Sequence, residues 1–195
     1  SNAVDAAVHN QEANLGGRPQ LELLTDLYRP LIEFDLNSAS LLPEEVGSAR
    51  LEVYQLSTGI LNQNMDLTLH AVSRDWEEGT GFANNVPGDG AGWLNATTTE
   101  TWNTVGGDFN GSFDFGNGPN GLIDSEILTA TSIETYHDFD VTTAVRAWLA
   151  GDLPNFGFAI QAHTAQFTEY QIASSEHANP AIRPRLIIET QEASI

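Results

Sequence analysis

The sequence predicts an all-β protein, an antiparallel, jelly-roll-like β-sandwich with one short helix and one long loop rich in Gly and Asn. Three observations lead to this prediction. Most segments alternate hydrophobic and polar residues with a period of two, one segment has helical spacing, and one stretch contains many turn-forming residues. Strands that alternate in this way have a single hydrophobic face, and a second sheet is the simplest structure that covers it.

The predicted strands show which side chains should face the core. In the segment 31–36, Ile32, Phe34 and Leu36 lie on one face, and Glu33 lies on the other. Further segments repeat the pattern, and they are residues 49–53, 66–71, 156–162 and 185–190. We expect the hydrophobic face of each strand to lie inside the sandwich.

The segment from Asp140 to Gly151 departs from this alternation. Val141, Val145 and Trp148 recur at the spacing of one helix face. Asp140 is a favourable residue at the start of a helix, and Gly151 is favourable just after its end. We therefore expect one short amphipathic helix that closes an end of the sandwich.

Residues 79–125 are dense in Gly, Asn and Thr, which predicts a long irregular loop. Trp76, Trp93 and Trp102 lie in this stretch or beside it. Because large aromatic side chains favour burial, we expect the loop to fold over the sandwich. Loops of this length inside a compact domain are commonly functional or ordered by something bound.

The composition limits the partners that the chain can bind. It contains 27 Asp or Glu against 7 Arg and no Lys, which gives a formal net charge of −20. This balance argues against nucleic acid and anionic membranes as partners, because both need clustered basic residues. Cys is absent, so disulfides and Cys-ligated metal sites are excluded. No run of residues approaches the roughly 18 apolar residues of a membrane span.

The chain is predicted to form a single domain. Residues 1–3, Ser-Asn-Ala, read as an expression scar, residues 4–190 as one β-sandwich module, and residues 191–195 as a tail. The sequence shows no internal repeat, and its length fits one domain.

Several short motifs follow one another along the chain. They are PLIEFDL (30–36), SARLEVY (48–54), RDWEEGTG (74–81), FDVTTAVRAWLAG (139–151), SSE (174–176) and RPRL (183–186). In this order they resemble the DNRLRE-domain family, extracellular bacterial β-sandwich modules related to carbohydrate-binding modules. The resemblance extends from about Asp5 to Thr190. It implies a polysaccharide as the partner, a secreted or cell-surface location in a bacterium, and further domains of a larger protein.

Two sets of oxygen-bearing side chains are candidates for binding calcium. Calcium takes several oxygen ligands, and a glycine-rich turn with carboxylates and amides can supply them. The first set lies in the long loop and consists of Asp108, Asn110, Asp114 and Asn117. Solvated turns, closed by the same side chains, are the alternative interpretation. The second set would join an early strand to a late segment at one edge of the sandwich, through Asp5, Asn14 and Glu176.

Sugar-binding modules use exposed aromatic rings flanked by polar groups, because ring faces pack on the C–H faces of sugars. The candidates are the aromatic residues Trp93, Trp102, Tyr54, Tyr136 and Tyr170, with Arg50 and Arg74 as polar partners. Trp93 lies in the glycine-rich loop and is the best candidate for an exposed ring. Burial in the core or in the loop is the alternative for each single aromatic residue.

Motifs that carry catalysis are not evident. The sequence has no Gly-x-Ser-x-Gly, no His-Glu-x-x-His and no phosphate-binding loop with Lys. This absence speaks against catalysis, and the resemblance then implies a non-catalytic, extracellular polysaccharide-binding module, which we expect to be stabilised by calcium. Two alternatives remain open, a structural or adhesive module without a sugar site and a jelly-roll polysaccharide lyase or hydrolase.

Overall fold

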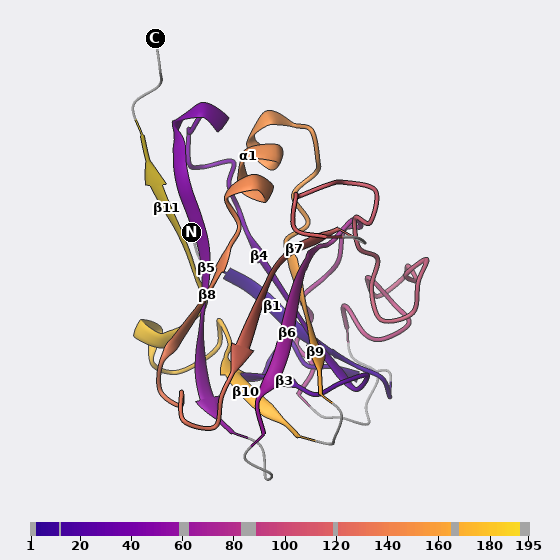
Figure 1. Cartoon of the computed structure of the whole chain (residues 1–195). Helices are drawn as coiled ribbons and strands as arrows, with labels where there is room; N and C mark the ends of the chain where they lie inside the picture. The colour runs from indigo at the N-terminus through magenta and orange to yellow at the C-terminus, as the bar shows by residue number, and fades with distance from the viewer. Residues whose placement is uncertain are drawn as a thin grey trace.

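Two antiparallel β-sheets pack face to face in the computed structural model of the chain, with one short α-helix at an end of the sandwich (Figure 1). The structure describes residues 3–11, 13–58, 63–82, 89–118, 121–164 and 168–191. This architecture confirms the predicted all-β sandwich. Within the described residues, no helix is long and hydrophobic enough to cross a membrane.

The first sheet has six strands, and its neighbouring strands are all antiparallel. In spatial order they are β2 (Ala13–Asn14), β1 (Ala3–His9), β4 (Tyr28–Phe34), β9 (Phe158–His163), β6 (Met65–Ala71) and β7 (Leu122–Leu128).

The second sheet is organised around one long strand, β5 (Val46–Ser57). Its spatial order is β11 (Arg185–Thr190), β5, β10 (Tyr170–Ala173) and β3 (Gln20–Leu23), and β8 (Tyr136–Asp140) also pairs with β5. Three residues of β5, Arg50, Leu51 and Glu52, pair with both β8 and β11. These two strands therefore lie on opposite edges of β5. Two 3-10 turns, η1 (Pro43–Glu45) and η2 (Pro180–Ile182), complete the described elements.

The core lies between the sheets and is filled by alternate residues of their strands. Ile32 and Phe34 of β4 and Leu51 and Val53 of β5 are almost fully buried in one hydrophobic cluster. The other predicted strands also turn their hydrophobic residues inward, which confirms the period-two pattern. Phe156 is an exception, because it precedes β9 and packs against a second cluster outside the sandwich.

The helix α1 (Thr142–Ala150) closes one end of the sandwich, as expected, and buries Val145 and Trp148. Its N-cap position is held by Val141 rather than the predicted Asp140, and Val141 makes no side-chain capping bond. Asp140 still contributes, because its carboxylate accepts the backbone N–H of Thr142 at 2.9 Å. Gly151 ends the helix with a φ of 76°, the left-handed conformation that favours glycine.

The long loop between β6 and β7 packs on the outer face of the first sheet (Figure 1). There Leu31 of β4 and Ala159 of β9 form a second hydrophobic cluster with Trp76 and Trp102 of the loop. The indole of Trp76 donates a hydrogen bond to the backbone oxygen of Phe156 at 2.9 Å. The loop is therefore anchored to the sandwich by its aromatic residues, as the sequence predicted.

Candidate functional site

Trp93 is half-buried and lies against an arginine of the first sheet. The guanidinium carbon of Arg29 lies 5.1 Å from the centroid of the Trp93 ring and 5.0 Å from that of Phe109. Burial lowers the pKa of Arg29 to about 10. Arg29 also donates a hydrogen bond to the backbone oxygen of Gly106. Trp93 thus helps to hold the loop on β4, and Arg29 lies over its ring.

The side chains of Trp102 and Arg74 also bind other residues of the loop. Trp102 is only 6% exposed, and its indole donates a hydrogen bond to Gly92 at 2.8 Å. Its ring face is therefore not available to a sugar, contrary to the sequence-based expectation. Arg74 pairs with Glu100 at 2.8 Å. The reason is physical: a glycine-rich loop has few hydrophobic side chains, so its tryptophans serve as its anchors.

Tyr54 and Arg50, by contrast, lie together on the outer face of the second sheet. Along β5, Arg50, Glu52 and Tyr54 point outward between the buried Leu51 and Val53. Two neighbouring strands extend this surface. We call it the tyrosine–arginine face, and it consists of Arg50, Glu52 and Tyr54 of β5, Tyr136 of β8 and Arg185 of β11.

The two tyrosines of this face form a cross-strand pair. Tyr54 lies opposite Tyr136, their ring centroids are 5.0 Å apart, and the rings meet edge to face at 75°. The guanidinium carbon of Arg185 lies 3.8 Å from the centroid of the Tyr136 ring. The hydroxyl of Tyr136 donates a hydrogen bond to the backbone oxygen of Ala181. Tyr136 is therefore fixed in place, and Tyr54 is the partly exposed ring beside it.

Ion pairs fix the two arginines of the tyrosine–arginine face. Glu52 pairs through one oxygen with Arg50 at 2.9 Å and through the other with Arg185. Arg50 also reaches Glu189 at 3.0 Å. The side chain of Glu52 is 9% exposed, whereas those of Arg50 and Arg185 are 37% and 44% exposed. The face therefore presents ordered guanidinium groups to solvent beside an aromatic ring.

The loop residues predicted to bind calcium form hydrogen bonds with the loop and with the strands that flank it. One carboxylate oxygen of Asp108 accepts two bonds from Asn103, both at 2.9 Å, and the other accepts the N–H of Thr104 at 2.6 Å. Asp114 accepts the N–H of Gly116 at 2.8 Å. Asn117 donates to the backbone oxygen of Ile123, and the backbone N–H of Asn110 donates to Ala71 at 2.9 Å. The side chains of Asp108 and Asp114 therefore close turns, whereas Asn117 bonds to β7 and the contact of Asn110 comes from its backbone.

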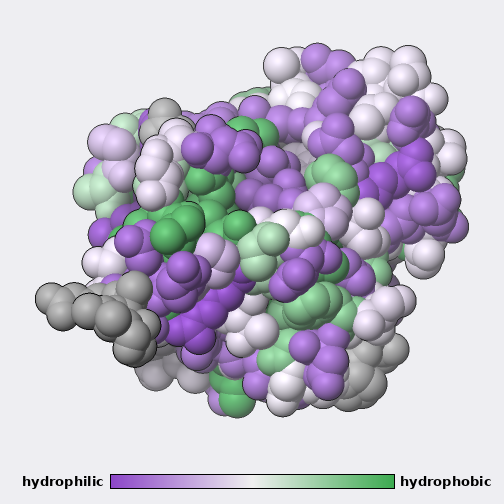
Figure 2. Space-filling view, turned by 90° about the horizontal axis from the view of Figure 1, so that it is seen from above, coloured by the Kyte–Doolittle hydropathy of each residue, from purple (hydrophilic) through white to green (hydrophobic). Residues whose placement is uncertain are grey.

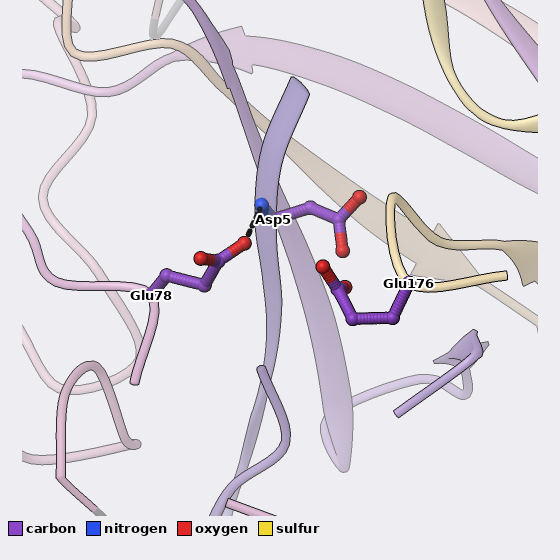
Figure 3. Close-up of side chains that lie close together, drawn as sticks. All are labelled: Asp5, Glu78 and Glu176. Atoms are coloured by element: carbon purple, nitrogen blue, oxygen red, sulfur yellow. Dashed lines mark hydrogen bonds between the residues drawn. The ribbon is translucent and has the colours of Figure 1, made fainter. Parts of the chain in front are cut away.

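Another group of carboxylates converges from three distant parts of the chain. Carboxylate oxygens of Asp5, Glu78 and Glu176 all lie within 4.8 Å of one another, and we call this group the acidic cluster (Figure 3). Asp5 belongs to β1, Glu78 to the long loop, and Glu176 to the connection that follows β10. The sequence therefore predicted the meeting of Asp5 and Glu176, but it missed Glu78.

Asn14, the third residue of that prediction, supports the cluster without joining it. Its side-chain amide donates to the backbone oxygens of Glu78 and Ala91, and its amide oxygen accepts the N–H groups of Gly16 and Gly81. Both polar atoms of the side chain are therefore already used to hold the loop.

Asp5 is fully buried, and only part of its hydrogen-bonding capacity is used. One carboxylate oxygen accepts the N–H of Ser175 at 2.6 Å, whereas the other has no hydrogen-bond partner. Burial and the nearby Glu176 raise the pKa of Asp5 well above its ordinary value, and burial also raises the pKa of Glu78. No basic side chain of the described residues forms an ion pair with the cluster.

A separate pocket of about 520 Å³ opens at the end of the sandwich that carries α1. Glu33, Asp35, Trp148 and Asn155 are among the residues that line it. Figure 2 views the molecule from this end, where a hydrophobic patch is bordered by hydrophilic residues. The pocket includes none of the residues that the sequence predicted for sugar or calcium binding.

Fold and surface together define a β-sandwich module with a covering loop, an aromatic and charged sheet face, and a carboxylate cluster around the buried Asp5. The chain matches the family model of the Disaggregatase related repeat domain over residues 22–188. It therefore belongs to this family. No curated protein matches the chain significantly.

This match corrects the resemblance to the DNRLRE-domain family, because the matching family is a different one. The chain also lacks the Asp-Asn-Arg-Leu-Arg-Glu hexapeptide for which that family is named. Three of the six motifs that carried the resemblance are two alternating strands and one helix. Such features recur in many sandwiches because they follow from covering a sheet, so their order did not identify the family.

Proposed function

We propose that the chain is a non-catalytic module that binds a polysaccharide outside the cell, through the tyrosine–arginine face. The observation that carries the proposal is the presence of Tyr54 and Arg50 on one outward sheet face, together with Tyr136 and Arg185. We also propose that it belongs to a larger secreted or cell-surface protein; the description of the family as a repeat domain supports the larger protein.

The face offers the two kinds of contact that a sugar needs. The partly exposed ring of Tyr54 can pack against the C–H face of a sugar ring, while guanidinium and carboxylate groups hydrogen-bond its hydroxyls. The ion pairs of Glu52 hold Arg50 and Arg185 before any ligand arrives. Ligand binding then immobilises fewer free side chains, which lowers its entropic cost.

The shape and charge of the face favour a neutral polysaccharide chain. A sheet surface does not close around a chain end, so it can contact an internal stretch of a polymer. The two arginines are neutralised by Glu52 and Glu189, and the chain as a whole has a formal net charge of −20. A polyanion would be repelled by this charge distribution.

Affinity electrophoresis of the whole chain in gels containing neutral or acidic polysaccharides tests the proposal. We expect retention by at least one neutral polysaccharide, and loss of most of that retention in the Tyr54→Ala variant. Phe82→Ala is the matched control, because Phe82 is 63% exposed and lies outside the tyrosine–arginine face. A thermal melt of each variant separates loss of binding from loss of folding.

Other outcomes would contradict the proposal. If no polysaccharide retains the chain, the structural or adhesive alternative is favoured. If the chain releases reducing ends or unsaturated products from a polysaccharide, the hydrolase or lyase alternative is favoured. Retention that survives Tyr54→Ala but disappears in Trp93→Ala would move the site to the loop.

A further inference from the structure

From the geometry of the acidic cluster we infer a binding site for one calcium-type divalent cation, formed by Asp5, Glu78 and Glu176. This inference is independent of the proposed polysaccharide binding. It also differs from the calcium set predicted in the loop, in which the carboxylates of Asp108 and Asp114 close turns.

The first argument is the arrangement of oxygen atoms. Three carboxylates from separate segments place oxygens within 4.8 Å of one another, a spacing that lets one cation contact all three. Figure 3 shows the carboxylates of Asp5 and Glu176 turned toward each other, with Glu78 approaching from the other side of β1. Like charges at this separation repel one another unless protons or a cation intervene.

The second argument is independent of the clustering and concerns the buried aspartate. Asp5 has no exposed surface, yet one of its carboxylate oxygens has no hydrogen-bond partner. Buried polar atoms are almost always paired, and an unpaired buried carboxylate oxygen is especially costly. A cation bound among the three carboxylates would satisfy this oxygen.

The chemistry of the ligands indicates a hard cation. All three side chains offer oxygen, and no His or Cys belongs to the group. Calcium accepts six to eight oxygen ligands in irregular geometry, which suits carboxylates supplied by three different segments. The remaining ligands would be water from a pocket of about 400 Å³ beside the cluster. Glu78 and Glu176 line this pocket in part, and Arg183 and Arg185 also belong to its lining.

The position of the site indicates what the cation does. Asp5 lies in the first sheet, Glu78 in the loop that covers this sheet, and Glu176 just after a strand of the second sheet. One ion would therefore join the two sheets and the covering loop. Binding of the cation raises the free energy of unfolding. Once the cation concentration exceeds the dissociation constant, this gain grows with the logarithm of the concentration.

Titration calorimetry with calcium chloride alone, on the whole chain freed of metal by chelation, tests the site. We expect one cation per chain, with affinity reduced at least tenfold in Asp5→Asn and in Glu176→Gln. Asp114→Asn is the matched control, because Asp114 is an acidic residue of the loop outside the cluster. It should bind calcium like the parent chain.

A melting experiment gives a second readout that does not depend on the variants. Calcium should raise the melting temperature of the parent chain above the value in sodium chloride of equal ionic strength, which controls for screening of the net charge. No such rise, or a full rise in both Asp5→Asn and Glu176→Gln, would overturn the inference. Loss of calcium binding in Asp114→Asn alone would assign the ion to the loop and would equally overturn it.

Discussion

Asn14 binds the backbone of Glu78, and through it fixes one corner of the acidic cluster. Its side-chain amide donates to the backbone oxygen of Glu78 at 2.6 Å and to that of Ala91 at 2.8 Å. Its amide oxygen accepts from Gly16 at 3.1 Å and from Gly81 at 2.9 Å. Asn14 is 1% exposed, so an almost fully buried side chain of a short β-strand holds two parts of the loop.

Replacing Asn14 should destabilise the chain strongly. Asn14→Ala leaves the N–H groups of Gly16 and Gly81 and the oxygens of Glu78 and Ala91 without these partners. Because unpaired buried polar groups cost about 1–3 kcal/mol each and some will regain water, we expect a loss of about 3 kcal/mol. Urea unfolding measures it. Asn10→Ala, which removes an exposed bond to Asp26, should cost less than about 1 kcal/mol, and equal losses would contradict this account.

The loop also depends on Gly79, because two segments of the loop lie very close together at this residue. Gly79 has a φ of 71°, and a Cβ atom there would lie 1.6 Å from the backbone oxygen of Asp89. Gly116 has a similar φ of 83°, but a Cβ atom would meet nothing within 4 Å. Gly116→Ala should therefore cost only the backbone strain, about 1 kcal/mol, whereas Gly79→Ala should cost several. Urea unfolding curves of the two variants measure the loss in the free energy of unfolding. Similar losses would show that the backbone at Asp89 can move away from residue 79.

The sequence predicted those parts of the fold that depend on local periodicity. Leu51 and Val53 alternate with Arg50 and Glu52, and this alternation alone determines which side chains enter the core. The helix position followed in the same way from Val145 and Trp148. The N-cap was placed one residue too early, since the Asp140 carboxylate can bond Thr142 from outside the cap position.

The candidate sites depended on contacts that local pattern does not contain. Tyr54 and Trp102 are both aromatic residues in polar surroundings, yet one is partly exposed and the other is buried under the loop. Glu78 was missed because its approach to Asp5 depends on the path of the loop, which Asn14 and Trp76 determine. Asp5 and Glu176 were predicted to meet because strand topology alone suggested a shared edge of the sandwich.

Glu33 should make stability depend on pH. Burial, together with Asp75 and Asp35 nearby, raises the pKa of Glu33 above its ordinary value. The folded chain thus holds a proton at Glu33 more tightly than the unfolded chain does. The stability that this group contributes is present at low pH and is lost as the pH rises through the raised pKa.

The neutral variant Glu33→Gln isolates this effect. It should be more stable than the parent chain near neutral pH, by no more than about 1 kcal/mol because the side chain is only half-buried, and the difference should vanish at about pH 4. Urea unfolding at several pH values measures it. Glu44→Gln, on the exposed surface of η1, should show no such pH-dependent gain. A gain for Glu33→Gln that grew toward acid pH would contradict the assigned sign.

The acidic cluster makes a prediction for the chain without metal. In Asp5→Asn the amide oxygen can still accept the N–H of Ser175, while the amide N–H can donate to Glu176. The variant thus removes a buried charge and leaves Glu78 and Glu176 with less repulsion. In chelator it should be more stable than the parent by about 1 kcal/mol, because a neutral amide is cheaper to bury beside two carboxylates than a third carboxylate is.

Saturating calcium should reverse this order. The parent chain gains the binding free energy of the ion, whereas Asp5→Asn has lost a charged ligand and gains little. Urea unfolding of both proteins, with chelator and with calcium, therefore gives curves that exchange places. A purely structural role for Asp5 predicts a variant that is less stable in both conditions by the same amount, and that result would separate a hydrogen-bonding aspartate from a metal ligand.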